Sequence, residues 1–260
     1  MFIRSTNASQ GGPFILSSWM VLSRVSLFVT FALVLSLHGV LNSAQAESSA
    51  FQCGTQAALS AAKRTELLDK VQNNYGAVRS LTASFLQYSY LASLETSETS
   101  SGKVWFDKPG KMHWHYVEPD AQDFLVRNDT VWLYQELDNQ IIIDEFRKIL
   151  LSDAPVSFLM GLGNLRRDFE VRSACQNEDG LLFELVPRAK GGGASDLKGF
   201  KLLVDPQSFM PKGASVTDVG DNITSIILSD LKTNSTVPAG TFEPNFPKSA
   251  DIIDRRKANG

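Results

Sequence analysis

Three features are scarce in this sequence, and each scarcity excludes a class of protein. Its 260 residues include two cysteines and three histidines, too few for a disulfide framework or a four-cysteine zinc site. Basic residues are not in excess, because the net charge is −3, which argues against a nucleic-acid-binding surface. Apolar runs of the roughly 20 residues that span a bilayer are absent. The hydrophobic fraction of 43% is ordinary for a globular protein and excludes a wholly disordered chain.

The first 46 residues have the pattern of a secretory signal peptide. They contain two arginines and no acidic residue, and an apolar run, Val25–Leu37, follows Arg24. The sequence Ala-Gln-Ala then ends at Ala46, where we expect cleavage. An uncleaved anchor is the less favoured alternative, because the apolar run is shorter than a membrane span. The start codon is either Met1 or Met20. Residues 47–260 are expected to form a single domain.

Both remaining cysteines, Cys53 and Cys175, lie in the exported part of the chain. An oxidising compartment favours their pairing, and we predict a disulfide between them. The bridge would close a loop of large sequence separation, which a chain-entropy model values at roughly 4–5 kcal/mol.

The sequence predicts one helix followed by many short strands. Apolar residues occur at helical spacing within Ser60–Tyr75, and Gly76 marks the end of this helix. From there, apolar and polar residues alternate with a period of two, and Pro, Gly, Asn and Asp mark the turns. This order predicts an antiparallel meander curled into a barrel or sandwich, without alternating βαβ units. The expected strands are Leu81–Leu86, Lys103–Asp107, Lys111–Tyr116, Thr130–Gln135, Gln140–Glu145, Phe169–Arg172, Leu181–Val186, Gly199–Val204, Ala214–Val219 and Ile223–Leu231.

A short apolar helix is expected to interrupt the meander. Ser152 and Pro155 form a helix start, and apolar residues follow up to Gly163. The pattern fits two interpretations, a mobile flap and a buried connector.

Recognisable catalytic chemistry is absent from the sequence. His113 and His115 point to one face of a strand, but no third metal ligand stands at motif spacing. Neither a G-x-S-x-G nor an H-E-x-x-H motif is present. We therefore expect no enzyme activity, no metal and no cofactor.

Aromatic residues are concentrated in one stretch instead. Trp105, Trp114 and Trp132 lie on three consecutive expected strands, among further Phe and Tyr residues. Such residues either fill a core or line an apolar cavity, and composition does not choose between the two.

From Leu67 onward the chain resembles the LolA-type periplasmic carriers of outer-membrane lipoproteins. The matching landmarks run in order through nearly all of the exported chain. They are the helix Leu67–Tyr75, the strand Leu81–Gln87 with its Phe-x-Gln, the segments Gly102–Tyr116 with Pro119 and Asn128–Tyr134 with Gln140, the lid-like Pro155–Gly161, and Phe242-Glu243-Pro244 with Pro247.

The resemblance implies a mainly β (α+β) fold, an incomplete, strongly curved antiparallel β-barrel closed by α-helices over a hydrophobic cavity. It implies a monomeric periplasmic carrier without catalysis, cofactor or nucleic acid. Such a carrier accepts triacylated lipoproteins from an inner-membrane ABC exporter and passes them to an outer-membrane receptor. Its contacts with these membrane proteins are transient.

The resemblance also assigns candidate residues. Lys108 stands where the family commonly has an arginine that takes part in the transfer, or hand-off, of the lipoprotein. Lysine keeps the positive charge but lacks the planar guanidinium group with its several N–H donors. His113 replaces a typical arginine, and Met112 replaces an aromatic residue. The expected lid residues are Phe158, Leu159 and Met160. The expected lipid-binding cavity residues are Phe85, Trp105, Met112, Trp114, Trp132, Leu133 and Ile143.

Other functions remain open beside the lipoprotein carrier. A periplasmic lipid-binding sensor or regulator can share this half-barrel, although such proteins usually carry a second domain. A carrier of another amphiphile, such as a free glycolipid, is a further alternative. A hydrolase is the least favoured, because no nucleophile-and-base set is evident.

Overall fold

The computed structural model describes residues 50–54, 58–146, 163–188 and 197–256. All of them belong to one of the two compact units of the chain, Ser36–Gly260. The expected signal peptide and the expected lid residues Phe158, Leu159 and Met160 lie outside the described residues. Among the helices that the structure describes, none is long and apolar enough to cross a membrane.

Helix α2 (Ala61–Gly76) confirms the predicted helix. Ser60 caps its N-terminus, because the Ser60 hydroxyl accepts a hydrogen bond from the Lys63 amide at 3.3 Å. Its buried face consists of the apolar residues that the spacing had placed together, namely Leu67, Leu68, Val71 and Tyr75. A second, unpredicted helix, α5 (Leu165–Asp168), is a single turn that packs beside α2.

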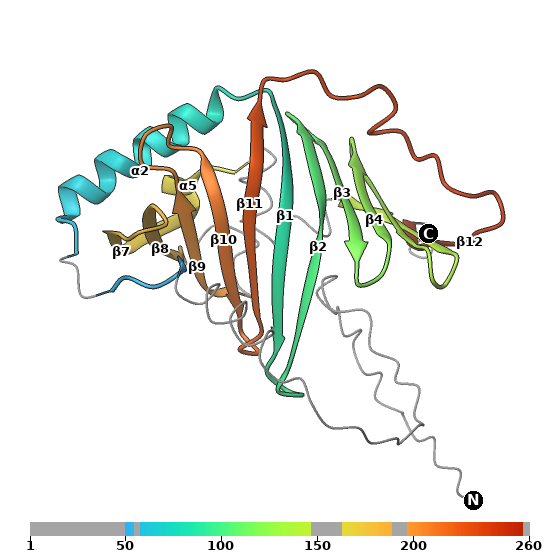
Figure 1. Cartoon of the computed structure of the whole chain (residues 1–260), viewed down its shortest axis with the longest axis horizontal. Helices are drawn as coiled ribbons and strands as arrows, with labels where there is room; N and C mark the ends of the chain where they lie inside the picture. Colours follow the sequence, from blue (N-terminus) through green and yellow to red (C-terminus); the bar gives the residue numbers. More distant parts are fainter. Residues whose placement is uncertain (1–49, 55–57, 147–162, 189–196, 257–260) are drawn as a thin grey trace, which may run out of the picture. The chain divides into compact units, whose positions relative to one another are not determined.

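Twelve strands form one sheet, ordered β12-β6-β5-β4-β3-β2-β1-β11-β10-β9-β8-β7 (Figure 1). Neighbouring strands pair antiparallel, apart from the parallel pair β12 and β6. Each predicted strand is present, usually longer than predicted. The bounds are β1 Ser80–Leu91, β2 Thr96–Asp107, β3 Lys111–Glu118, β4 Gln122–Arg127, β5 Thr130–Gln135, β6 Gln140–Glu145, β7 Phe169–Gln176, β8 Leu181–Pro187, β9 Leu197–Val204, β10 Pro211–Asp218, β11 Ile223–Thr233 and β12 Asp251–Asp254.

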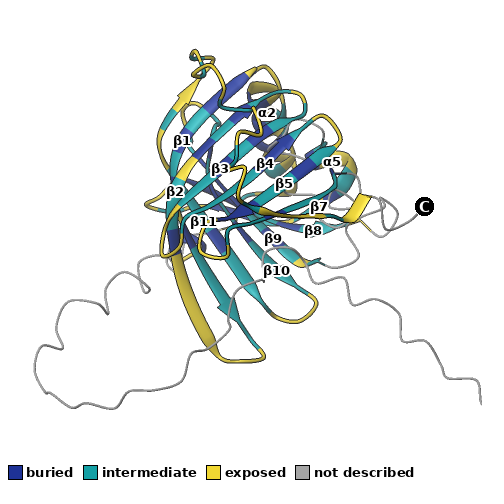
Figure 2. Cartoon of the chain, turned by 90° about the vertical axis from the view of Figure 1, so that its right-hand side faces the viewer, coloured by how far each residue is buried: buried dark blue, intermediate teal, exposed yellow. Residues whose placement is uncertain are grey.

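The sheet is open, because β7 and β12 form its two edges within the described chain. It is curved around α2, and this arrangement confirms the predicted incomplete barrel (Figure 1). We call the face that contacts α2 the inner face and the opposite face the outer face. The inner face carries the main hydrophobic core, which includes Leu81, Phe106, Trp114, Phe183 and Phe200. Figure 2 shows the buried residues within the strands and the exposed ones mainly at their connections.

Two segments near the ends of the described chain cover parts of the outer face. At β7–β11, Phe51 packs with Cys175, Leu182 and Leu203 in a second cluster. The predicted Cys53–Cys175 disulfide is present there, with Cα atoms 5.8 Å apart.

At β3–β5, the outer face is crossed by the connection from β11 to β12. Figure 1 shows this connection running from β11 past β1–β4 to the far edge of the sheet. The Thr241 carbonyl oxygen lies 2.8 Å from His113 Nδ1, and the rings of Phe246 and Tyr134 lie 5.3 Å apart. This connection therefore covers part of the outer face of β3 and β5.

Candidate functional site

The inner face of β1–β3 is an aromatic wall. The ring of Phe85 lies 4.7 Å from Trp114 and 4.9 Å from Tyr116, in both cases edge to face. Phe106 approaches Trp114 from the other side, at 6.1 Å. Strand alternation places these residues together, because Phe85 and Phe106 lie on neighbouring strands and Trp114 lies on the next.

The seven expected cavity residues divide between the two faces. The register from β2 to β6 has no irregularity after Gly102. Directly paired residues therefore share one face of the sheet, and the pairing shows to which face each side chain points. Phe85, Met112, Trp114 and Leu133 belong to the inner face, whereas Trp105, Trp132 and Ile143 belong to the outer face. Convergence of all seven on one cavity would require a bulge, and these pairings contain none.

A small apolar cavity lies next to the aromatic wall on the inner face. It measures about 20 Å³ and is lined by described residues of β2, β3, β10 and β11, including Phe106, Trp114, Ile226 and Leu228. Sites for small organic ligands usually measure about 300–1,000 Å³, so this cavity alone is smaller than such a site.

Apolar surface that is only partly buried continues from the wall toward the β6 edge. Phe124, Leu133 and Ile142 are directly paired on β4, β5 and β6 and share the inner face. Each is partly exposed, in contrast to Phe106 at 1% and Trp114 at 2%. These three residues form the part of the inner face that we call the apolar ramp.

A polar pair, Gln87 and Tyr116, lies beside the aromatic wall, and its contact was not predicted from the sequence. The Tyr116 hydroxyl donates a 3.0 Å hydrogen bond to Oε1 of the buried Gln87. Burial, with a contribution from the Glu98 carboxylate, raises the pKa of Tyr116 well above its ordinary value. The phenol therefore stays neutral and donates to the amide oxygen of Gln87, whereas Nε2 of the same amide donates to Ser89 Oγ at 3.1 Å.

Lys108, the expected hand-off residue, joins the β2–β3 turn to the end of α2. Its Nζ donates a 2.6 Å hydrogen bond to the Tyr75 carbonyl and lies 3.4 Å from the centre of the Tyr75 ring. Burial lowers the pKa of Lys108 to about 8. The hydrogen bond links the β2–β3 turn to the C-terminus of α2, but burial disfavours the charged ammonium by more than the negative end of the helix dipole favours it, so the pKa is lowered.

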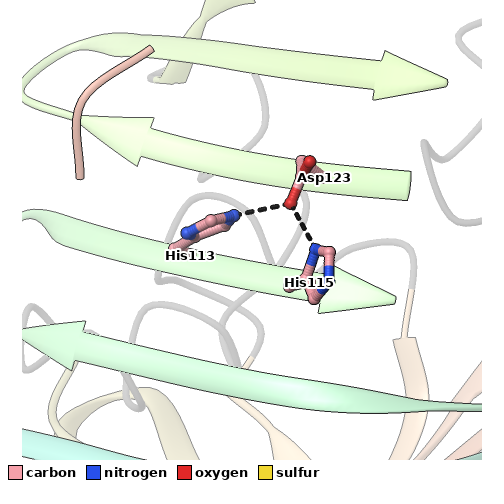
Figure 3. A group of neighbouring side chains, drawn as sticks. All are labelled: His113, His115 and Asp123. Atoms are coloured by element: carbon pink, nitrogen blue, oxygen red, sulfur yellow. Dashed lines mark hydrogen bonds and ion pairs between the residues drawn. The ribbon is translucent and has the colours of Figure 1, made fainter. Parts of the chain in front are cut away.

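Three potential metal ligands meet on the outer face, on β3 and β4 (Figure 3). One Asp123 oxygen, Oδ1, lies 2.7 Å from His113 Nε2 and 2.8 Å from His115 Nδ1. Burial acts to raise the pKa of Asp123, but the hydrogen bonds from the two histidines outweigh it, and the pKa is lowered. The sequence showed the two histidines but not Asp123, because strand β4 was not predicted.

A shallow cleft of about 260 Å³ lies where the β11–β12 connection meets the ends of β2–β4. Its charged side chains are already paired: Lys111 with Asp107 at 2.7 Å, and Arg127 with Glu243. The cleft therefore presents no uncompensated charge of these residues to a ligand.

Comparisons with known proteins point to one family. The model of the family described as "Outer membrane lipoprotein carrier protein LolA" matches residues 76–245. An outer-membrane lipoprotein carrier protein of Cupriavidus pinatubonensis is 27% identical over 219 residues, which are 82% of this chain and 97% of the relative. The protein of the same name from Legionella pneumophila is 27% identical over 184 residues, 70% of this chain and 87% of the relative.

Solved structures with a similar arrangement are more distant. An uncharacterized conserved protein from Thermus thermophilus is 15% identical with a TM-score of 0.48, over 74% of this chain and 99% of that one. A LolA superfamily protein from Nitrosomonas europaea is 13% identical with a TM-score of 0.39, over 68% of this chain and 96% of that one.

Proposed function

Because this chain belongs to the LolA family of outer membrane lipoprotein carriers, we propose that its inner face shelters the acyl chains of lipoproteins. The observation that carries the proposal is the continuity of the aromatic wall with the partly exposed apolar ramp of Phe124, Leu133 and Ile142. Apolar surface of this kind stabilises a bound acyl chain by about 0.8 kcal/mol for each methylene it removes from water.

The role requires reversible burial and no covalent chemistry. In the proposed route, the exported protein accepts a triacylated lipoprotein from an inner-membrane ABC exporter and delivers it to an outer-membrane receptor. The signal peptide is removed after Ala46, and the carrier works in the periplasm as a monomer, with transient contacts to both membrane proteins.

The cargo is proposed to lie along the inner face, from the apolar ramp toward the aromatic wall. The cavity of about 20 Å³ beside Phe106 and Trp114 is smaller than one acyl chain, so binding at that point requires these side chains to move. We propose that Phe158, Leu159 and Met160 act as the lid over this face. We further propose that Lys108 acts in hand-off by holding or releasing the end of α2, where it contacts the Tyr75 carbonyl.

Leu133 and Trp132 provide a matched pair to test the proposal. They are neighbours on β5 and both are partly exposed, but Leu133 faces inward and Trp132 faces outward. A photo-crosslinking amino acid at position 133 is expected to capture an acylated lipoprotein in the periplasm, whereas the same residue at position 132 is not. Equal capture at both positions, or capture at 132 alone, would refute the inner face as the acyl-binding surface.

A second measurement identifies the cargo. The purified protein is expected to bind a triacylated lipopeptide and not its unacylated twin, with a change in the fluorescence of Trp114, which lies in the wall. Mass spectrometry of the protein isolated from its own periplasm then separates a lipoprotein from a glycolipid. A co-purified glycolipid without lipoprotein would replace the lipoprotein-carrier function with that of another amphiphile.

A further inference from the structure

We propose that His113, His115 and Asp123 form a binding site for a divalent transition-metal ion, with Zn²⁺ as the fitting ion. The site would use His113 Nε2, His115 Nδ1 and one or both Asp123 carboxylate oxygens, and these ligand atoms lie within 4.8 Å of one another. Two imidazoles and one carboxylate are a ligand set that zinc accepts, with a fourth position left for water.

The positions of the donors on the sheet are well determined. His113 and His115 are two residues apart on β3, so both point to the outer face, and Asp123 is paired directly with His115 on β4. Ligands on paired strands are held more precisely than ligands on loops. Figure 3 shows the three side chains converging from the two strands on one point.

His113 has the orientation of a metal-binding histidine. Its Nδ1 lies 2.8 Å from the Thr241 carbonyl oxygen, and its Nε2 lies 2.7 Å from Asp123 Oδ1. Both partners are hydrogen-bond acceptors, whereas a neutral imidazole has a single N–H. When Nδ1–H donates to the carbonyl, the Nε2 lone pair points toward Asp123, which is the orientation in which Nε2 can bind a metal ion.

A metal ion bound at Nε2 uses the Thr241 contact as well. Histidines that bind metals usually donate their other ring N–H to a carbonyl or carboxylate, which fixes the ring orientation. Thr241 provides that acceptor for His113. An ion at Nε2 would thereby connect β3 and β4 and reinforce the contact of β3 with the β11–β12 connection.

The fit requires only a small movement. Ligand atoms at zinc distances of 2.0–2.1 Å are about 3.3 Å apart in a tetrahedral site. The nitrogen–oxygen contacts of 2.7 and 2.8 Å must therefore open by about half an ångström, which side-chain rotation allows. The side chains of His113 and Asp123 are 19% and 22% exposed, and that of His115 is 42% exposed, so an ion can enter from solvent.

One nearby charge opposes the ion. Lys103 is paired with His115 on β2 and shares the outer face, but its side chain is exposed, so solvent and salt screen the repulsion.

The test uses the untagged, oxidised, full exported chain after treatment with a chelator. Zn²⁺ is titrated in competition with a chromogenic chelator, and one ion per chain is expected. Asp123→Asn and His115→Gln are each expected to weaken Zn²⁺ affinity by at least about 100-fold, since each removes a ligand. Asp120→Asn, which changes an exposed carboxylate on the β3–β4 turn, serves as the matched control and is expected to leave the affinity unchanged.

A spectroscopic readout separates this site from nonspecific binding. Co²⁺ in place of Zn²⁺ is expected to give visible absorption and to quench Trp105, whose ring lies 5.4 Å from His113. Trp105→Phe is expected to remove the quenching without changing the Co²⁺ affinity.

Circular dichroism of the metal-free variants checks their folding. If Asp123→Asn unfolds, His115→Gln, which changes the most exposed ligand, provides the affinity test. Affinity that falls by less than tenfold in folded Asp123→Asn and His115→Gln overturns the proposal, as does the absence of stoichiometric binding by the unchanged protein. Because the metal site and the acyl-binding surface occupy opposite faces of the sheet, failure of one leaves the other intact.

Discussion

Removal of the Cys53–Cys175 disulfide is expected to cost this protein a large share of its stability. The bridge joins residues separated by 122 positions, so it restricts a long loop in the unfolded chain. In the chain-entropy model this restriction amounts to about 5 kcal/mol at 25 °C. For a chain of this size, such a loss lowers the melting temperature by roughly 10–20 °C.

The loss is expected to arise in the unfolded state, because other contacts hold the bridged segment in the folded protein. The Asn177 side-chain amide donates hydrogen bonds to the carbonyls of Ala50 and Gln52, and Lys201 Nζ donates one to the carbonyl of Phe51. Phe51 is 4% exposed, so it also contributes hydrophobic burial. The segment should stay in place without the bridge, with little change in the folded structure.

The suitable variant is Cys53→Ser with Cys175→Ala. Cys53 is exposed and tolerates a hydroxyl, whereas Cys175 is 1% exposed, and a buried hydroxyl there would add a separate penalty. Urea unfolding of this variant is compared with that of the unchanged protein, oxidised and reduced. The variant and the reduced protein should agree within about 1 kcal/mol, since both lack only the bridge. A loss below about 1 kcal/mol in both would refute the loop-entropy reasoning.

Three further outcomes are expected from single substitutions. Gly102→Ala should destabilise the protein by at least about 2 kcal/mol in urea unfolding, because a Cβ there would collide with the His115 carbonyl oxygen across the β2–β3 pair. Gly199→Ala, whose Cβ meets open space, is the control and should change stability far less. Ser60→Ala should cost about 1 kcal/mol through loss of the N-cap of α2. Burial lowers the pKa of Lys108 to about 8 in the folded protein, whereas the unfolded chain keeps the ordinary, higher value. Above pH 8 the unfolded chain therefore binds more protons than the folded protein does. The free energy of unfolding should rise as the pH increases past 8. Lys108→Met should reduce this rise, and an unchanged pH dependence would contradict the assigned pKa.

Local patterns predicted the elements that depend on one covered face. Helix α2 has a single apolar stripe, and its buried residues were all identified from their spacing. Strand β3 alternates cleanly, with Met112 and Trp114 buried on the inner side. In such elements the sequence period reports the structure directly, because the residues of one side are buried and those of the other side are more exposed.

Strand β4 was missed because both of its faces are covered. Leu125 and Val126 are consecutive, yet they are 1% and 0% exposed, since one faces outward and the other faces the inner core. Burial on both faces removes the period of two on which strand prediction depends. The short β12 was missed for a different reason. It pairs with β6 across more than 100 residues of chain, and a local sequence pattern does not report such a distant partner.

Apolar and aromatic residues on both faces of the sheet also explain why the sequence did not show which face is concave. Both faces of β2–β6 carry aromatic residues, so alternation did not show which face is concave, and the seven expected cavity residues came from both. Asp123 remained hidden as a partner of the histidines for the same reason, because its position opposite His115 depends on β4. A turn signal at Pro119-Asp120 was the available clue to that hairpin.

On the proposed function, the energetics of the inner face favour one place of entry for acyl chains. Four buried residues of α2 contribute roughly 1.5–3 kcal/mol each, so lifting the helix away would cost about 6–12 kcal/mol. That cost equals most of the stability of a typical domain, which is about 5–15 kcal/mol, so complete removal of α2 would come close to unfolding the protein. The apolar ramp of Phe124, Leu133 and Ile142 is already partly exposed and pays no such penalty when covered by an acyl chain. On the proposed function, acyl chains therefore enter at the β4–β6 end of the inner face and extend toward Trp114, while α2 stays seated with its end held by Lys108.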